Sequence, residues 1–199
     1  MTRLLVATRN AHKTAEIAAM LAGIFEVADL RGRPDAPEVE ETGATFGENA
    51  ALKAEAISAF TGGWALADDS GLEVDALGGA PGVRSARFAG ENATDADNNR
   101  LLLEKLSALP AAPRTARFRC VLALARAGAL VAIFDGAVEG RVIESPRGPG
   151  GFGYDPLFIP DGHDATFGEL PAEVKNGISH RSRALAKFRA WLEARPPLA

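Results

Sequence analysis

The chain opens with a short apolar segment that is followed by a segment of helical period. Residues 4–7 are apolar and are bounded by polar residues, as in a buried strand, and apolar residues at helical spacing then continue to Leu21. A second apolar run, residues 64–67, is followed by the polar and small residues 68–71, which predict the end of a strand. The pattern therefore predicts a strand–turn–helix unit and a second buried strand further along.

Two apolar runs later in the chain predict a β-hairpin. Apolar and polar residues alternate from 115 to 124, and residues 127–129 then separate this run from a second one at 130–134. Cys120 lies on the apolar face of the first run, so we expect it in the core rather than as a nucleophile. A further strand is predicted at residues 154–159.

Three helices are indicated by residues that cap helix N-termini. Thr45 has Glu48 three residues later and Thr94 has Asp97 three residues later, so that each pair forms a capping box before an apolar stripe of helical period. Ser179 precedes a last stripe of this kind. Helices and strands are interleaved, without an internal repeat or linker. This predicts one α/β domain, residues 1–199, with a mixed central sheet flanked by helices.

The composition fits such a domain and excludes several other classes of protein. The chain has 199 residues, of which 47% are hydrophobic, and its single cysteine cannot form an internal disulfide, which favours a reducing, cytoplasmic setting. The longest apolar stretch, residues 121–134, contains Arg126 and is too short to cross a bilayer. A net charge of -4 argues against a general coat of nucleic acid. We expect residues 195–199, with two prolines, to form a frayed tail.

Two segments offer groups that suit an anionic ligand. Residues 8–13 lie between the first strand and its helix, where backbone N–H groups and a lysine favour a phosphate, although an ordinary capped turn has the same composition. The segment lacks the glycine spacing of a Walker loop. Lys175, His180 and Arg181 precede or open the last helix, where cations oppose the helix dipole. Either a bound anion or a solvated helix face would account for them.

Acidic residues gather in two separate segments. Glu38, Glu40 and Glu41 lie in a Pro- and Gly-rich loop, residues 31–44, and Asp68-Asp69 follow the second predicted strand. Mg²⁺ takes a few carboxylate oxygens and completes its shell with water and substrate phosphates, so the two segments suit a magnesium site. A solvated loop and a plain turn are the alternative interpretations.

A glycine-rich segment, residues 148–153, contains one aromatic residue. Glycines allow a backbone to approach a ligand closely, and Phe152 between them suits a stacking surface for a nucleobase. Segments of this composition also simply turn the chain, so the glycines alone do not assign a function.

Six motifs occur along the chain and together are far more specific than any single one. They are Thr8-x-Asn10-x-x-Lys13, Glu40-Glu41-Thr42-Gly43-x-Thr45-Phe46-x-Glu48-Asn49-Ala50, Ala67-Asp68-Asp69-Ser70-Gly71-Leu72, Gly78-Gly79-Ala80-Pro81-Gly82, Gly150-Gly151-Phe152-Gly153-Tyr154-Asp155-Pro156 and Ile178-Ser179-His180-Arg181. With these motifs, essentially the whole chain resembles the inosine/xanthosine triphosphate pyrophosphatases, which remove deaminated purine nucleotides such as ITP, dITP and XTP. The resemblance implies a Maf/Ham-like fold of two lobes with the active site in the cleft between them, and a homodimer. It also implies Mg²⁺-dependent hydrolysis of the nucleotide to monophosphate and pyrophosphate, which keeps deaminated purines out of DNA and RNA.

The resemblance further implies roles for individual residues. Asp69 would accept a proton from the attacking water, and Glu40 and Asp69 would bind Mg²⁺. The other predicted positions would contact the substrate; they are Thr8, Arg9, Asn10, Ala11, His12, Lys13, Lys53, Ser70, Phe152, Gly153, Tyr154, Asp155, Lys175, His180 and Arg181. Arg9 and His12 stand where small residues or glycine are common in the family.

Two other functions share part of this pattern. A related pyrophosphatase for modified pyrimidine or methylated nucleotides would have the same metal chemistry and a different base pocket. A non-catalytic nucleotide sensor would bind the triphosphate without hydrolysing it, but binding alone requires no base, and both Glu40 and Asp69 are present. The expected partner is a small purine nucleotide, and neither a nucleic acid nor a membrane.

Overall fold

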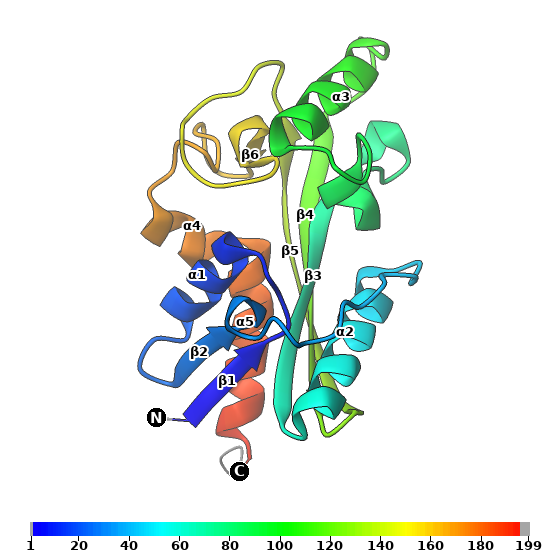
Figure 1. The fold of residues 1–199 in the computed structure, drawn as a ribbon. Coiled ribbons are helices and arrows are strands. Elements are labelled where there is room, and N and C mark those ends of the chain that lie inside the picture. The colour runs from blue at the N-terminus through cyan, green and yellow to red at the C-terminus, as the bar shows by residue number, and fades with distance from the viewer. Residues whose placement is uncertain (1, 196–199) are drawn as a thin grey trace. The chain divides into compact units, whose positions relative to one another are not determined.

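The computed structural model describes residues 2–195, which form a mixed sheet with helices packed on it (Figure 1). The strands are β1 (Thr2–Val6), β2 (Phe25–Asp29), β3 (Trp64–Val74), β4 (Thr115–Arg126), β5 (Ala129–Val142) and β6 (Phe158–Pro160). The helices are α1 (Ala11–Met20), α2 (Phe46–Thr61), α3 (Asp95–Ser107), α4 (Ala172–Ile178) and α5 (His180–Glu193). The strand order is β2-β1-β3-β4-β5-β6; β1 is parallel to β2 and β3, and β5 is antiparallel to β6. The predicted α/β class with a mixed sheet is thus confirmed.

The chain divides into two compact units. Unit 1 takes residues up to 69, residues 120–136 and those from 181 onward, and unit 2 takes residues 70–119 and 137–180. β3, β4 and β5 each contribute one part to each unit, so residues far apart in the sequence belong to the same unit. Within residues 2–195, no helix is long and apolar enough to cross a membrane. Of the predicted frayed tail, residues 196–199 lie outside the described residues.

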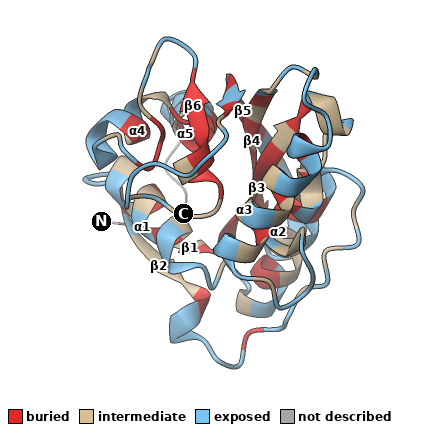
Figure 2. Ribbon diagram, turned by 90° about the horizontal axis from the view of Figure 1, so that it is seen from above, coloured by how far each residue is buried: buried red, intermediate tan, exposed pale blue. Residues whose placement is uncertain are grey.

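The sheet of unit 1 is covered on both faces. One face packs Leu66, Cys120 and other buried strand residues against Ile17 of α1 and Phe188 of α5. The alternate residues of the same strands are also buried; because strand side chains alternate in direction, these residues face α2, which lies on the opposite side of β3 (Figure 1). Buried residues therefore concentrate on the strands, whereas the outer faces of the helices are exposed (Figure 2). Cys120 belongs to this core, as predicted.

The core of unit 2 is built around aromatic rings. Phe118 packs edge-on against Phe158, with 4.8 Å between ring centroids, and Phe167 contacts both rings. Leu102 and Leu106 of α3 are buried in the same cluster.

The locally encoded features form as predicted. The capping boxes of Thr45 with Glu48 and of Thr94 with Asp97 are both present, one residue before α2 and α3 respectively. The hairpin between β4 and β5 turns at Ala127 and Gly128, which both have positive φ, the backbone that a two-residue hairpin turn of this hand requires. α5 begins at His180, directly after Ser179.

Three sequence-based boundaries are wrong. β3 does not end at residue 67 but continues through residues 68–71 to Val74, because the two aspartates have cationic partners inside unit 1. Glycine at position 71 allows a close approach of the chain, since a Cβ there would lie only 2.6 Å from the Gly82 carbonyl oxygen. The strand predicted at 154–159 starts only at Phe158, because a 3₁₀ turn occupies the preceding three residues. β5 extends beyond the predicted 130–134 to Val142. The sequence pattern did not predict β2 or α4.

Candidate active site

Unit 1 brings two lysines and three acidic residues into one cluster. Lys53 Nζ lies 2.9 Å from Asp69 Oδ1, 2.7 Å from Glu41 Oε1 and 3.0 Å from the Asp68 carbonyl oxygen. Lys13 Nζ lies 2.6 Å from Asp68 Oδ1. Lys13, Lys53 and Asp69 were predicted site residues, and they come from α1, α2 and β3. The fold therefore gathers three of the predicted residues at one place.

Asp69 has one carboxylate oxygen committed and one available. Oδ1 accepts a hydrogen bond from Lys53, whereas Oδ2 is shielded from solvent and has no hydrogen-bond partner among residues 2–195. Burial raises the pKa of Asp69, and this effect outweighs the opposite effect of the Lys53 and Lys13 charges, so the pKa lies above its ordinary value. A buried carboxylate with an available oxygen and a raised pKa has the properties of a proton acceptor or a cation ligand.

Asp68 is the centre of a buried ion-pair network. Arg181 Nε donates to Asp68 Oδ2 at 2.8 Å, Arg181 Nη1 donates to Glu16, and the Cys120 thiol lies 3.2 Å from Asp68 Oδ2. Burial alone would raise the pKa of Asp68, but the charges of Arg181 and Lys13 outweigh it and hold the pKa well below its usual range. Burial and the Asp68 charge raise the pKa of Cys120, so this cysteine stays a thiol.

This network accounts for a cation at the start of α5. Arg181 is fully buried, and two internal carboxylates, those of Asp68 and Glu16, balance its charge. Its predicted contact with the nucleotide stays a prediction. Lys175, the other cation before α5, has an equivalent internal partner in unit 2, described below.

Residues 8–13 form a capped turn. Asn10 Oδ1 accepts from the backbone N–H groups of His12 and Lys13 at 2.9 and 3.1 Å, and the Asn10 N–H donates to Thr8 Oγ1 at 3.1 Å. Ala11 is exposed. The turn fixes the start of α1 and so places Lys13 in its first turn, from which the ammonium reaches Asp68. Phosphate binding by this segment stays a prediction.

The loop 31–44 meets the cluster through Glu41 and not through Glu40. Glu41 is half-buried against Lys53, whereas the Glu40 side chain is exposed and has no partner in the described part of the chain. The Arg9 guanidinium donates to the Ala36 carbonyl oxygen at 2.9 Å, which ties the first turn to this loop. The assignment of Glu40 to a metal is not tested by these contacts.

Unit 2 assembles a second group of predicted residues. Asp155 Oδ2 accepts from the Phe152 N–H at 2.8 Å and from Lys175 Nζ at 2.5 Å, and Lys175 Nζ lies 5.0 Å from the centroid of the Phe152 ring. Asp155 and Lys175 are both buried, and their ion pair balances the two charges inside the protein. Gly151 is required for this packing, because its φ is 75° and a Cβ there would lie 2.2 Å from Asp155 Oδ2.

Tyr154, His180 and Ser70 complete the predicted set. The Tyr154 hydroxyl donates to the Ser85 carbonyl oxygen at 2.9 Å, and burial raises its pKa well above the ordinary value, so the hydroxyl stays protonated. The His180 ring stacks on Phe118 at 4.8 Å between centroids. Ser70 is half-buried in β3.

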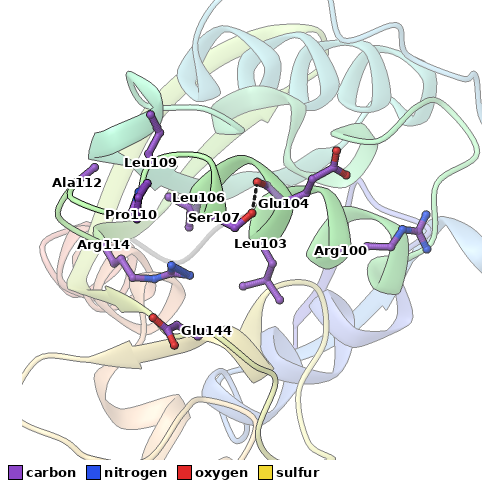
Figure 3. Close-up of a pocket in the computed structure, with 10 residues that line it drawn as sticks. All are labelled: Arg100, Leu103, Glu104, Leu106, Ser107, Leu109, Pro110, Ala112, Arg114 and Glu144. Carbon is purple, nitrogen blue, oxygen red and sulfur yellow. Dashed lines mark hydrogen bonds between the residues drawn. The ribbon is translucent and has the colours of Figure 1, made fainter.

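Two hollows lie on unit 2. One, of about 680 Å³, is lined by α3 and the segment after it together with Arg114 and Glu144, none of which is a predicted site residue (Figure 3). The other, of about 520 Å³, is lined by Phe152 and Gly153 on one side and by Asp95 and Asn99 of α3 on the other. In the part of the chain that the structure describes, no three His, Cys, Asp or Glu residues form a metal-binding group by themselves.

The sequence analysis named Glu41 and Asp68 only as members of two acidic segments that suit Mg²⁺, and it did not predict that they pair with Lys53, Lys13 and Arg181. It missed Glu16 altogether. Glu16 lies on a helix with other polar residues and meets Arg181 only through the fold, 165 residues away. No local pattern distinguishes Glu16 from a solvated helix residue.

Known proteins similar to this chain share its fold and most of its length. Residues 4–191 match the Ham1 family. A dITP/XTP pyrophosphatase from Geobacter sulfurreducens is 56% identical over 193 residues, which are 96% of this chain and 97% of that protein. A solved structure of a HAM1 protein from Coxiella burnetii has a TM-score of 0.88 at 42% identity and covers 98% of this chain and 100% of that one. The chain therefore belongs to the Ham1 family.

Proposed function

We propose that this protein hydrolyses the triphosphates of deaminated purines, such as ITP, dITP and XTP, to the monophosphate and pyrophosphate. Relatives named dITP/XTP pyrophosphatase align with nearly the whole chain. This sequence similarity identifies the protein as a nucleoside triphosphate pyrophosphatase. The observation that carries the proposal is the cluster in unit 1, where Lys13 and Lys53 lie with Asp69, whose second oxygen is available.

The two lysines supply charge for the triphosphate. Burial would lower the pKa of Lys53, but the charges of Asp69 and Glu41 outweigh it and raise the pKa, so Lys53 stays protonated at neutral pH. Lys53 is therefore a cation in the reaction and not the base. In phosphoryl chemistry most of the catalytic effect comes from positioning and from stabilising charge, which suits two lysines placed in this way.

Asp69 orients the attacking water and accepts its proton. Oδ1 is held by Lys53, which fixes the plane of the carboxylate and leaves Oδ2 to the water. The raised pKa makes Asp69 a stronger base than an exposed aspartate. Lys53 thus has a second task, since it holds the base in place.

The residues present fit a magnesium ion. Asp69 Oδ2 is an unpartnered buried acceptor, and Glu40, next to the lysine-bound Glu41, has an exposed carboxylate that no lysine engages. These two residues would hold Mg²⁺, which would neutralise phosphate charge and acidify the bound water. Few protein ligands are needed, because Mg²⁺ keeps several waters and takes phosphate oxygens.

Unit 2 selects the base. Phe152 provides the face on which the purine stacks, and Lys175, held beside that ring by Asp155, offers a donor. Deaminated purines carry a 6-keto acceptor where adenine carries an amino donor, so a donor at this place favours the former and leaves adenine unmatched.

The substrate assignment is tested with a panel of nucleotides. Purified protein with Mg²⁺ and ITP, XTP, GTP, ATP, CTP or dUTP should release pyrophosphate from ITP and XTP in preference to ATP by roughly a hundredfold or more. Release of phosphate instead of pyrophosphate would contradict the proposed reaction. Turnover confined to pyrimidine nucleotides would favour the related pyrophosphatase, and tight binding without turnover would favour the sensor.

Replacing Glu40 and replacing Glu41 should have different effects on the Mg²⁺ concentration that the enzyme requires. Glu40→Gln removes a proposed ligand and should raise the Mg²⁺ concentration for half-maximal activity by about tenfold or more. Glu41→Gln is the matched control, because it removes the negative charge of a partner of Lys53 and should change KM for the nucleotide while leaving the Mg²⁺ requirement as it was. Activity measured against Mg²⁺ concentration decides; the reverse pattern would assign the metal to Glu41.

A further inference from the structure

Two side chains of α3 hold the glycine that follows Phe152. The Gly153 N–H donates to Asp95 Oδ2 at 2.6 Å, and the Gly153 carbonyl oxygen accepts from Asn99 Nδ2 at 2.9 Å. Asp95 and Asn99 lie 58 and 54 residues from Gly153 in the sequence. Both backbone polar groups of one residue are therefore fixed by a distant helix.

The geometry of α3 explains how two side chains reach the same residue. Residues four apart lie on one face of a helix, so Asp95 and Asn99 point in the same direction from successive turns. The capping box of Thr94 and Asp97 fixes the first turn, and with it the place of Asp95. An acidic residue at this position is also favoured by the helix dipole. The start of α3 is thus a rigid support.

The two hydrogen bonds act on the backbone of Phe152. The Gly153 N–H belongs to the same planar peptide group as the Phe152 carbonyl, so Asp95 fixes the plane on the C-terminal side of the aromatic residue. On the N-terminal side, Asp155 Oδ2 accepts from the Phe152 N–H at 2.8 Å. The direction in which the Phe152 side chain leaves the backbone is therefore set by two carboxylates, one on each side.

We propose that Asp95 and Asn99 are positioning residues that aim the Phe152 ring and thereby set the selection of the base. This rests on the proposed function, because it requires that the purine stacks on Phe152. Neither residue touches the nucleotide; each acts through Gly153. The hollow of about 520 Å³ lies between α3 and this segment, so without the two hydrogen bonds the segment has space to move toward the helix.

The role is tested with Asn99→Asp and Asp95→Ala. Asn99→Asp keeps the shape of the side chain but places an oxygen opposite the Gly153 carbonyl oxygen. Asp95→Ala removes the acceptor of the Gly153 N–H, at an exposed position where folding tolerates the change. Each should raise KM for ITP by about tenfold, change kcat little, and lower the ratio of kcat/KM for ITP to that for ATP. Asp95→Asn keeps an acceptor oxygen and should restore most of the ratio.

Asn98→Asp is the matched structural control. Asn98 is the neighbouring residue on α3, is buried, and bonds to the Ala89 N–H and the Ala86 carbonyl, not to Gly153. Its replacement should lower the melting temperature without changing the ITP to ATP ratio. If Asn99→Asp and Asp95→Ala likewise lower only the melting temperature, the two residues are merely structural and the proposal is overturned.

Phe152→Leu separates failure of this inference from failure of the proposed function. It should reduce the ITP to ATP ratio by itself, and combining it with Asp95→Ala should add little, because both changes act on the same ring. If Phe152→Leu leaves the ratio unchanged, the base does not stack on Phe152 and the proposed function is wrong at that point. If Phe152→Leu reduces the ratio and the α3 variants do not, only the inference is wrong.

Discussion

Replacing Asp69 with asparagine should lower the rate of pyrophosphate release by on the order of a hundredfold or more. The amide oxygen can still accept from Lys53, so the side chain keeps its place in the cluster. The group at the position of Oδ2 becomes an NH₂, which neither accepts a proton nor binds a metal ion. Because Lys53 keeps a hydrogen bond to the amide oxygen and its ion pair with Glu41, we expect kcat to fall and the fold to remain. Steady-state kinetics with ITP, together with a melting curve, check both expectations.

Asp135→Asn serves as the control for this change. Asp135 lies on β5 in the same unit, is exposed, and pairs with the exposed Lys187. Its replacement should leave kcat and KM unchanged, since it removes one carboxylate from unit 1 without touching the site. An Asp69→Asn protein as active as the Asp135→Asn protein would refute the catalytic assignment of Asp69 and would leave the substrate assignment intact.

Replacing Asp68 with asparagine should destabilise the protein by about 3–5 kcal/mol. The Arg181 guanidinium is fully buried, and Asp68→Asn removes one of the two carboxylates, Asp68 and Glu16, with which it forms ion pairs. Removing one partner of a buried pair leaves an under-compensated charge in a medium of low dielectric, which is why the cost exceeds that of a surface pair. For a chain of this length the melting temperature should fall on the order of 10 °C. Urea unfolding measures the free-energy change directly.

The stability difference between wild type and Asp68→Asn should depend on pH in a defined way. Since the pKa of Asp68 in the folded protein lies below its ordinary value of 3.8, the ionised carboxylate stabilises the fold above that value, and the stabilisation is lost as the pH falls through the folded-state pKa. The difference in stability between wild type and Asp68→Asn should therefore stay constant between about pH 5 and 8 and shrink in stronger acid. Asp135→Asn, which breaks an exposed pair, should cost less than about 1 kcal/mol. Equal costs for the two variants would show that burial of the Asp68 pair contributes nothing.

Much of the fold could be predicted because the deciding interactions are local. A capping box joins residues three apart, so Thr45 with Glu48 and Thr94 with Asp97 indicate the starts of α2 and α3 without further context. Strand alternation from Thr115 to Cys120 likewise reports which residues are buried, although from Cys120 to Ala125 both faces of β4 are buried. β2 escaped prediction because its five residues are partly polar and only partly buried, so neither period is distinct.

The extension of β3 shows where local reasoning fails. Four polar or small residues after an apolar run indicate a turn, and residues 68–71 have that composition. They remain in the strand because Lys13, Lys53 and Arg181 reach the two aspartates from three different helices. The partners lie between 16 and 113 residues away in the sequence, too far for a local pattern to link an acid with its cation.

The sequence by itself determined which residue types are available for the proposed nucleotide site: lysines in two helices, an acid pair in β3, and an aromatic residue among glycines. Only the tertiary structure decided what each of them does, because a charge acquires its role from its surroundings. Burial between lysines leaves Asp69 with an available oxygen and a raised pKa. Asp68, the preceding residue, instead forms a buried ion pair with Arg181. The pairing of Gly153 with α3 is of the same kind, since backbone hydrogen bonds to a distant helix leave no trace in composition or period.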